Sequence, residues 1–172
     1  GVVSSVNSLV GGLANDRVGN KAVSSSGGGN YLVATSAWNG NAGALTWIDP
    51  AAPTVGTVNA SNSLVGASPG DQVGSGGIQN ILSGKWTIFS PNWNGNMGAV
   101  TFIDEATGRI GTVSAANSLV GSAAGDRVGS GGRRFVGATI AILSPDWANG
   151  INAAAAGAIT WFDSGSIVTG AV

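Results

Sequence analysis

The stretch Asn62-Ser63-Leu64-Val65-Gly66, followed by Gly70-Asp71-Gln72-Val73-Gly74, is the middle one of three copies of the same pattern. The other two copies begin at Asn7 and Asn117, so that successive copies are 55 residues apart (62 − 7 and 117 − 62). A fixed period of this size is typical of solenoids, propellers and other arrays of small structural units. The sequence therefore predicts a repeat protein.

The composition is that of an ordered, weakly charged protein. Hydrophobic residues make up 43% of the 172 residues and charged residues 9%, which is far from the composition of disordered chains. Seven Lys plus Arg against eight Asp plus Glu give a net charge of −1, too small to attract a polyanion over a distance, so we expect no nucleic-acid partner. We also expect no membrane span, because the sequence lacks the run of about 20 apolar residues that a transmembrane helix needs.

The chain contains no Cys and no His. This removes the thiolate and imidazole nucleophiles, the usual zinc ligands and the most common general base. We predict that the protein is not an enzyme and has no catalytic residue, no bound metal and no cofactor. Because the chain starts at Gly1 without Met, we expect it to be a processed or excised piece of a longer protein.

Each repeat is predicted to contain four strands. In the second copy these are residues 78–82, 86–89, 99–103 and 110–114, which are separated by turn segments rich in Gly, Pro, Asn and Ser. Strands such as residues 140–143 are apolar at consecutive positions, as expected for strands that are covered on both faces. Small antiparallel sheets stacked face to face are the blades of a β-propeller.

We therefore predict an all-β fold of three four-stranded antiparallel repeats that resemble propeller blades. A β-solenoid is the alternative, because short strands with Gly, Asn and Ser at the turns would serve it as well, although no shorter sub-period is evident. The extra strand at the N-terminus, Gly1 to Ser4, matches residues 56–59 and 111–114. The predicted parts of this one repeat domain are an N-terminal strand and linker at 1–21 and repeats at 22–59, 60–114 and 115–172.

Two known kinds of repeat are similar to this pattern. In the second copy, Gly70 to Gly77, Ser90-Pro91 and Gly98-Ala99-Val100-Thr101-Phe102 resemble the FG-GAP repeat of integrin-type propellers. The strings Asn-Ser-Leu-Val-Gly and Gly-Asp-x-Val-Gly-Ser-Gly-Gly look like a tandem repeat of large secreted bacterial proteins, including haemagglutinin-like adhesins. The resemblance implies propeller blades and an extracellular or cell-surface location. The closely spaced Asp residues of a calcium-binding FG-GAP loop are missing, so calcium binding is not expected.

A Trp-containing loop recurs after the second strand of each repeat and is the candidate carbohydrate site. An indole face can stack on the C–H patch of a sugar while amide and carboxylate groups pair with its hydroxyls. In the alternative interpretation, each Trp covers the rim of its blade against the next blade. The candidate residues are Trp38, Asn39, Trp93, Asn94, Asp146 and Trp147.

One aspartate recurs before the Val-Gly step of each copy, at Asp16, Asp71 and Asp126. In such a turn-rich segment an Asp side chain can accept backbone N–H bonds, and we predict a structural turn at each position. A glycan-hydrolysing role would need two carboxylates about 5 to 10 Å apart. Single acids one repeat apart would meet this distance only around a narrow central channel.

These features favour an extracellular structural or adhesive module that self-associates into a filament or surface layer. The alternatives are a lectin-like carbohydrate-binding propeller, with a glycan as partner, and last a glycan-processing enzyme. Propellers usually have about four to eight blades, so three cannot close a ring. We therefore expect a homo-oligomer or a head-to-tail array, in which Gly1 to Ser4 add a strand to a neighbour.

Overall fold

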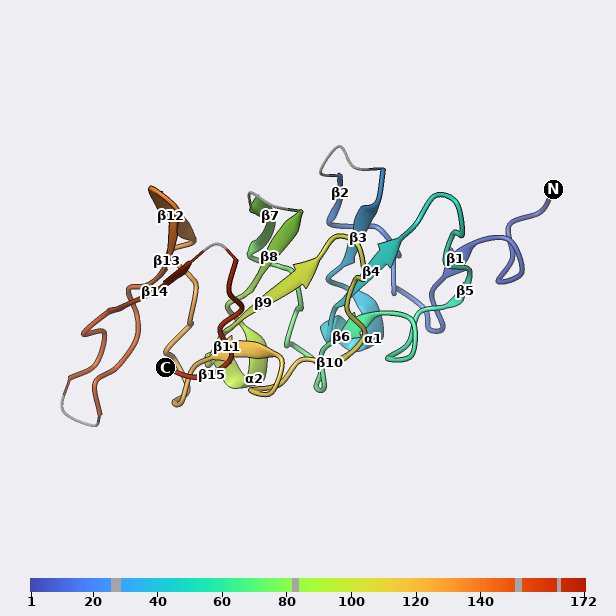
Figure 1. Ribbon diagram of the computed structural model, residues 1–172. Helices are drawn as coiled ribbons and strands as arrows, with labels where there is room; N and C mark the ends of the chain where they lie inside the picture. The colour runs from blue at the N-terminus through green and yellow to red at the C-terminus, as the bar shows by residue number, and fades with distance from the viewer. Residues whose placement is uncertain (26–28, 82–83, 151–152, 164) are drawn as a thin grey trace.

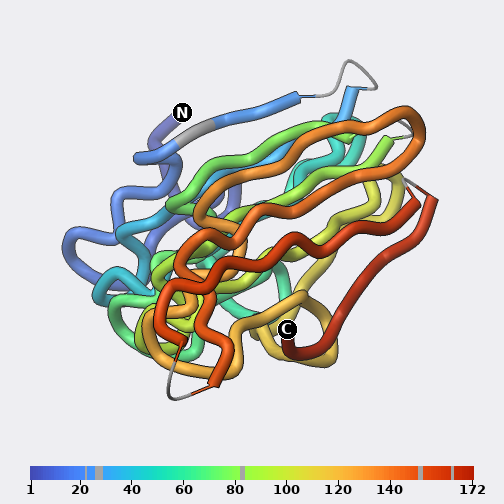
Figure 2. Tube along the Cα trace, turned by 90° about the vertical axis from the view of Figure 1, so that its left-hand side faces the viewer, coloured from blue at the N-terminus to red at the C-terminus, as the bar shows by residue number. Residues whose placement is uncertain are grey.

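The computed structural model describes residues 1–25, 29–81, 84–150, 153–163 and 165–172. These residues form short strands and two single-turn helices, so the all-β prediction is confirmed. Three mainly antiparallel sheets stand in a row, with the N-terminus at one end and the third sheet at the other (Figure 1). Viewed along the row, the strands of the three sheets overlie one another (Figure 2).

The strands recur in the same order from one Asn-Ser-Leu-Val-Gly stretch to the next, and we call each such segment a unit: unit 1 is 7–61, unit 2 is 62–116 and unit 3 is 117–172. Unit 1 contains β1 (Leu9–Val10), β2 (Ala22–Ser25), β3 (Tyr31–Thr35), α1 (Trp38–Asn41), β4 (Ala44–Ile48) and β5 (Gly56–Thr57). Unit 2 contains β6 (Leu64–Val65), β7 (Gly77–Ile81), β8 (Lys85–Ser90), α2 (Trp93–Asn96), β9 (Ala99–Asp104) and β10 (Gly111–Thr112). Unit 3 contains β11 (Ser118–Val120), β12 (Arg133–Val136), β13 (Thr139–Ser144), β14 (Ala158–Asp163) and β15 (Gly170–Ala171). Leu82, the last residue of the strand predicted at 78–82, lies outside the described residues.

The prediction of a four-stranded antiparallel meander is wrong for the last strand of each unit. In unit 1, β2, β3 and β4 are antiparallel, but β5 pairs in parallel with β1, with Gly56 opposite Leu9. The free edge of β4 is instead taken by β6 of the next unit, with Leu45 opposite Leu64. Because one strand edge can hold only one partner, the first strand of the following unit displaces the predicted fourth strand.

The prediction of an additional strand at Gly1 to Ser4 is also wrong. These residues form no strand, and Val2 and Val3 are exposed. The matching residues of unit 1, Gly56 and Thr57, are held by β1, which belongs to the same unit. Gly1 to Ser4 pair with none of the described strands.

Apolar clusters fill the space between successive sheets. Between units 1 and 2, Leu45 packs with Trp86 and Ile88. Between units 2 and 3, the rings of Phe102 and Phe162 meet edge to face with centroids 5.0 Å apart. The facing sides of the sheets are covered, but the prediction of strands covered on both faces is wrong for the outer faces of the first and third sheets, where Tyr31 is half-exposed and Trp161 is 69% exposed. The described strands form an open row in Figure 1 and not a ring.

A buried hydroxyl pair accompanies each of these two contacts. Thr46 Oγ1 lies 2.7 Å from Ser63 Oγ, and Thr101 Oγ1 lies 2.6 Å from Ser118 Oγ. In both serines the hydroxyl hydrogen is donated to the preceding Asn side chain. Since a hydroxyl carries one hydrogen, the threonine must be the donor in each pair.

Neither of the two helices of the described chain is long enough to cross a membrane. Each has four residues, and in each the second and third residues depart from helical dihedral angles. The helices are the turns that carry Trp38 and Trp93, whereas Trp147 lies in a loop without a helical turn.

Candidate functional site

The Asp71 carboxylate is buried in the loop that follows β6. Its Oδ2 accepts the backbone N–H groups of Ala67 and Ser68 at 2.9 and 3.0 Å. Its Oδ1 accepts the backbone N–H of Asn94, in the Trp loop, at 2.9 Å. Hydrogen bonds to an ionised acceptor are stronger than those between neutral groups. One side chain therefore fixes its own loop and joins it to the Trp loop of the same unit.

Asp16 and Asp126 make equivalent contacts in units 1 and 3. Both are buried, and the Oδ1 atom of each again reaches the Trp loop. The partners, at distances between 2.7 and 3.1 Å, are the backbone N–H groups of Gly12, Leu13 and Asn39 for Asp16, and of Ser122, Ala123 and Ala148 for Asp126. The sequence showed both features but not the contact between them. The sequence feature that could have indicated this contact is the nearly constant separation between each Asp and its partner in the Trp loop. The separation is 23 residues in units 1 and 2 and 22 in unit 3.

The three recurring Trp side chains pack against the apolar clusters. Trp93 is only 9% exposed and belongs to the cluster between units 1 and 2. Trp38 and Trp147 are half-buried against neighbouring clusters. Each Trp therefore packs within the row of units, and only Trp38 and Trp147 keep an appreciable part of the indole accessible.

The polar candidates of the Trp loops face solvent. Asn39 and Asn94 are exposed and have positive φ angles of 48° and 49°, a left-handed conformation that Asn adopts more readily than most residues. Asp146 accepts the Ser130 hydroxyl at 3.1 Å and lies 3.8 Å from Nε of Arg127. The structure thus places the polar groups beside the indoles in units 1 and 2, and binding of a carbohydrate there stays a prediction.

Arg133 is a charged side chain that joins two units. It donates a hydrogen bond to the carbonyl of Asn80, in β7, and its guanidinium lies 4.4 Å from the ring centroid of Phe135. Partial burial lowers the pKa of this guanidinium through desolvation. The contact holds the β12 hairpin of unit 3 against unit 2.

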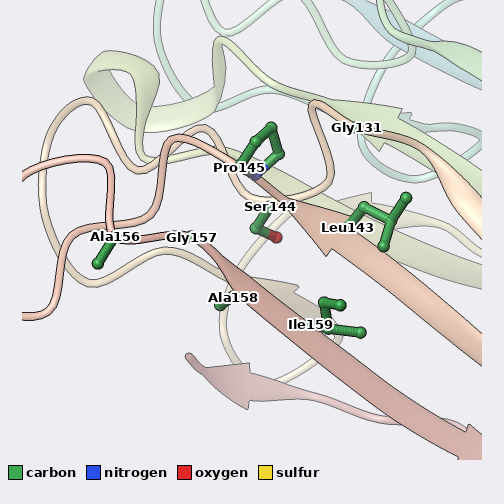
Figure 3. Close-up of a pocket in the computed structure, with 8 residues that line it drawn as sticks. All are labelled: Gly131, Leu143, Ser144, Pro145, Ala156, Gly157, Ala158 and Ile159. Atoms are coloured by element: carbon green, nitrogen blue, oxygen red, sulfur yellow. The ribbon is translucent and has the colours of Figure 1, made fainter.

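An open apolar pocket of about 450 Å³ lies at the third-sheet end of the row (Figure 3). Leu143 of β13 and Ile159 of β14 are cross-strand neighbours and form one side of it. The complete lining is Gly131, Leu143, Ser144, Pro145, Ala156, Gly157, Ala158 and Ile159. No ionisable side chain contributes to this lining, so the pocket is suited to an apolar group.

Acidic residues do not gather anywhere in the described ranges into a group of three or more that could hold a metal ion. The buried carboxylates lie in separate units and are each engaged by three backbone donors. This arrangement stabilises the loops that carry these aspartates.

A family model described as a repeat of unknown function (DUF5650) matches residues 1–20, 26–75, 81–130 and 140–172. These matches cover most of the chain and confirm the tandem repeat. No curated protein and no solved structure matches. The more specific links to FG-GAP blades and to bacterial adhesins stay predictions.

Proposed function

The chain belongs to the DUF5650 family of repeats, and we propose that it is an extracellular or cell-surface structural module that self-associates as part of a filament or surface layer. The extracellular location rests on the resemblance of its repeats to those of large secreted bacterial proteins. The structural role is supported by the recurring aspartates, because each of them bonds to backbone groups of its own unit.

The proposal of self-association rests on one observation. Apolar side chains that are buried between units have exposed counterparts at the end of the row. Val100 and Phe102 of β9 face unit 3 and are 0% and 1% exposed. The residues at the same positions of β14, Ile159 and Trp161, are 55% and 69% exposed. An apolar sheet face that is buried between units but open at the end of the row is the kind of surface that marks a protein interface. With 9% charged residues, the chain has little like-charge repulsion to oppose such a contact.

The test is the mass of the full chain in solution as a function of concentration. We expect the mass to rise above the 16.7 kDa of one chain as the concentration reaches tens of micromolar. Light scattering gives the mass, and electron microscopy of the same samples distinguishes closed oligomers from filaments. A constant mass of one chain across this range would contradict the proposal.

Glycan binding at the Trp loops is the second candidate function, favoured by the exposed Asn39 and Asn94 beside the indoles. Trp38→Ala and Trp93→Ala separate it from a purely structural role. Truncation of the buried Trp93 should lower the free energy of unfolding by about 3 to 5 kcal/mol whatever the function. Loss of binding on a glycan array by folded Trp38→Ala protein would support the lectin-like candidate. Absence of binding by the unaltered chain would oppose it.

A further inference from the structure

We propose that the third-sheet end of the molecule is a docking site for the N-terminal end of a second copy of this chain. In this contact β1 of the second copy adds to the free edge of β14, and Val18 occupies the pocket beside Gly157. The inference deepens the proposed function and rests on it, since it names the surface and the partner of self-association. The chain builds the same contact twice within itself, between units 1 and 2 and between units 2 and 3.

The first matching element is a strand edge. Within the chain, the first strand of a unit pairs antiparallel with the third sheet strand of the preceding unit, as β6 does with β4 and β11 with β9. In the described strands β1 pairs only with β5, and β14 only with β13. These two strands therefore have open edges at opposite ends of the row (Figure 1). The internal register predicts Leu9 opposite Ile159 and Val10 opposite Ala158.

The second matching element is the hydroxyl pair. Thr160 and Ser8 occupy the positions of the bonded pairs Thr46 with Ser63 and Thr101 with Ser118, but both are half-buried and are not bonded to each other. The Ser8 hydroxyl donates to Asn7, as the other two serines do to their preceding Asn. Its oxygen is therefore ready to accept the hydrogen of Thr160 from a second chain.

The third matching element is the valine that follows each aspartate. Val73 and Val128 are fully buried, and their N–H groups donate to the carbonyls of Ala42 and Met97 at 3.1 and 3.0 Å. Val18 is half-exposed. In the third unit the position of Ala42 and Met97 is taken by Ala156, which lines the pocket.

The backbone of the pocket already has the shape that the two internal contacts use. Gly43, Gly98 and Gly157 have φ angles of +80°, +81° and +79°. A Cβ on Gly43 would overlap the backbone nitrogen of Val73, and a Cβ on Gly98 that of Val128. A Cβ on Gly157 would meet nothing closer than 3.5 Å. The backbone of Val73 and Val128 thus occupies, inside the row, the space that is open beside Gly157.

The N-terminal face offers the complementary apolar surface. Tyr31 and Val33 of β3 are half-exposed, whereas Trp86 and Ile88 at the same positions of β8 are buried against unit 1. A second hollow, of about 290 Å³, lies at this end, and its lining includes Val18, Tyr31 and Val33. Both apolar halves of an internal contact are therefore present, one at each end of the chain.

The first test uses two charge substitutions that block opposite ends. Ile159→Glu places a charge in the proposed contact at one end, and Val33→Glu does so at the other. Each should weaken self-association by at least roughly tenfold, because burial of an unpaired carboxylate is unfavourable. An equimolar mixture of the two variants retains one intact contact and should form a dimer that does not grow. Ile110→Glu is the matched control, since Ile110 is 58% exposed but lies in the middle unit, and it should associate like the unaltered chain.

The second test does not depend on a destabilising charge. The chain has no Cys, so single-cysteine chains report one contact each. Equivalent hydroxyls lie 2.7 and 2.6 Å apart within the chain, which is close enough for cysteines at these positions to form a disulfide. Chains with Ser8→Cys should therefore cross-link to chains with Thr160→Cys on mild oxidation. Chains with Ser61→Cys, on the exposed turn before β6, should not cross-link to Thr160→Cys.

The outcomes separate the inference from the proposed function. Association that persists in both glutamate variants, without the cross-link, would overturn the docking site but leave self-association standing. A monomeric unaltered chain at tens of micromolar would overturn both. Association lost in each variant and restored as a dimer in the mixture would support the head-to-tail contact.

Discussion

At the scale of single residues, the recurring aspartates explain why a chain with few charges keeps a buried carboxylate in every unit. Asp71 accepts three backbone N–H bonds from two loops, and these loops have no strand pairing of their own. The carboxylate thus takes the place of the missing backbone acceptors. The sequence predicted that these residues form turns, and it could not show that the same residue also fixes the Trp loop.

We expect Asp71→Ala to lower the free energy of unfolding by about 3 kcal/mol, because three partly buried donors each lose an acceptor worth about 1 kcal/mol. Urea unfolding followed by Trp fluorescence measures the effect. Asp104→Ala is the matched control: Asp104 accepts a single exposed backbone N–H, from Ala106, and its loss should cost less than about 1 kcal/mol. Equal losses in the two variants would show that the contacts of Asp71 do not stabilise the unit.

At the scale of elements, the sequence predicted which residues form strands better than which strands pair. Residues 99–103 carry the β-branched and aromatic pattern of a covered strand and form most of β9. Gly56 and Thr57 were predicted to lie antiparallel to the preceding strand, yet they pair in parallel with β1. Strand propensity depends on local side chains, whereas pairing depends on which distant strand the fold places beside an edge. The pairing of β6 with β4 joins two units. Apart from the repeat itself, no local sequence pattern indicates it.

The glycines that end the Trp loops provide a test of these contacts between elements. Gly98→Ala should be strongly destabilising, because a Cβ there would overlap backbone of unit 3 as well as strain a positive φ. Gly157→Ala has nearly the same φ but open space, and should cost only about 1 kcal/mol through left-handed strain. Urea unfolding at a concentration where the chain is monomeric compares the two. A larger loss for Gly157→Ala would contradict the view that the same position is filled inside the row and open at its end.

At the scale of the whole molecule, the row has two different ends that are the two halves of one internal contact. A contact between unlike surfaces need not close on itself, and repeated head to tail it produces a filament. Whether two chains can meet in this way depends on the residues that flank the contact. Gly1 to Val3 are the segment in question, because they match the last strand of a unit in sequence.

In a head-to-tail pair, Gly1 to Val3 of the second chain would fall on the place that Gly170 to Val172 of the first chain already hold. This place is beside β11, where Leu119 lies opposite Gly170 and the N–H of Val172 donates to Val120 at 2.9 Å. The sequence led us to expect that the N-terminal residues add a strand to a neighbour. In this arrangement the edge of β11 that they would join is already occupied by β15. Removal of Gly1 to Val3 should leave association unchanged or strengthen it, as measured by light scattering over a dilution series.

Removal of Gly170 to Val172 reverses this expectation, because it frees the edge of β11 for the N-terminal residues of the second chain. That variant should still associate, whereas removal of both segments should weaken association. Among the backbone hydrogen bonds of the equivalent strand in unit 1 are two that the N–H groups of Gly56 and Val58 donate to Ser8 and Val10. At about 1 kcal/mol each, their loss corresponds to roughly thirtyfold in Kd. If removal of Gly1 to Val3 alone abolished association, β15 would have to yield its place to the incoming chain, and the contact would be a strand exchange and not an addition to β14.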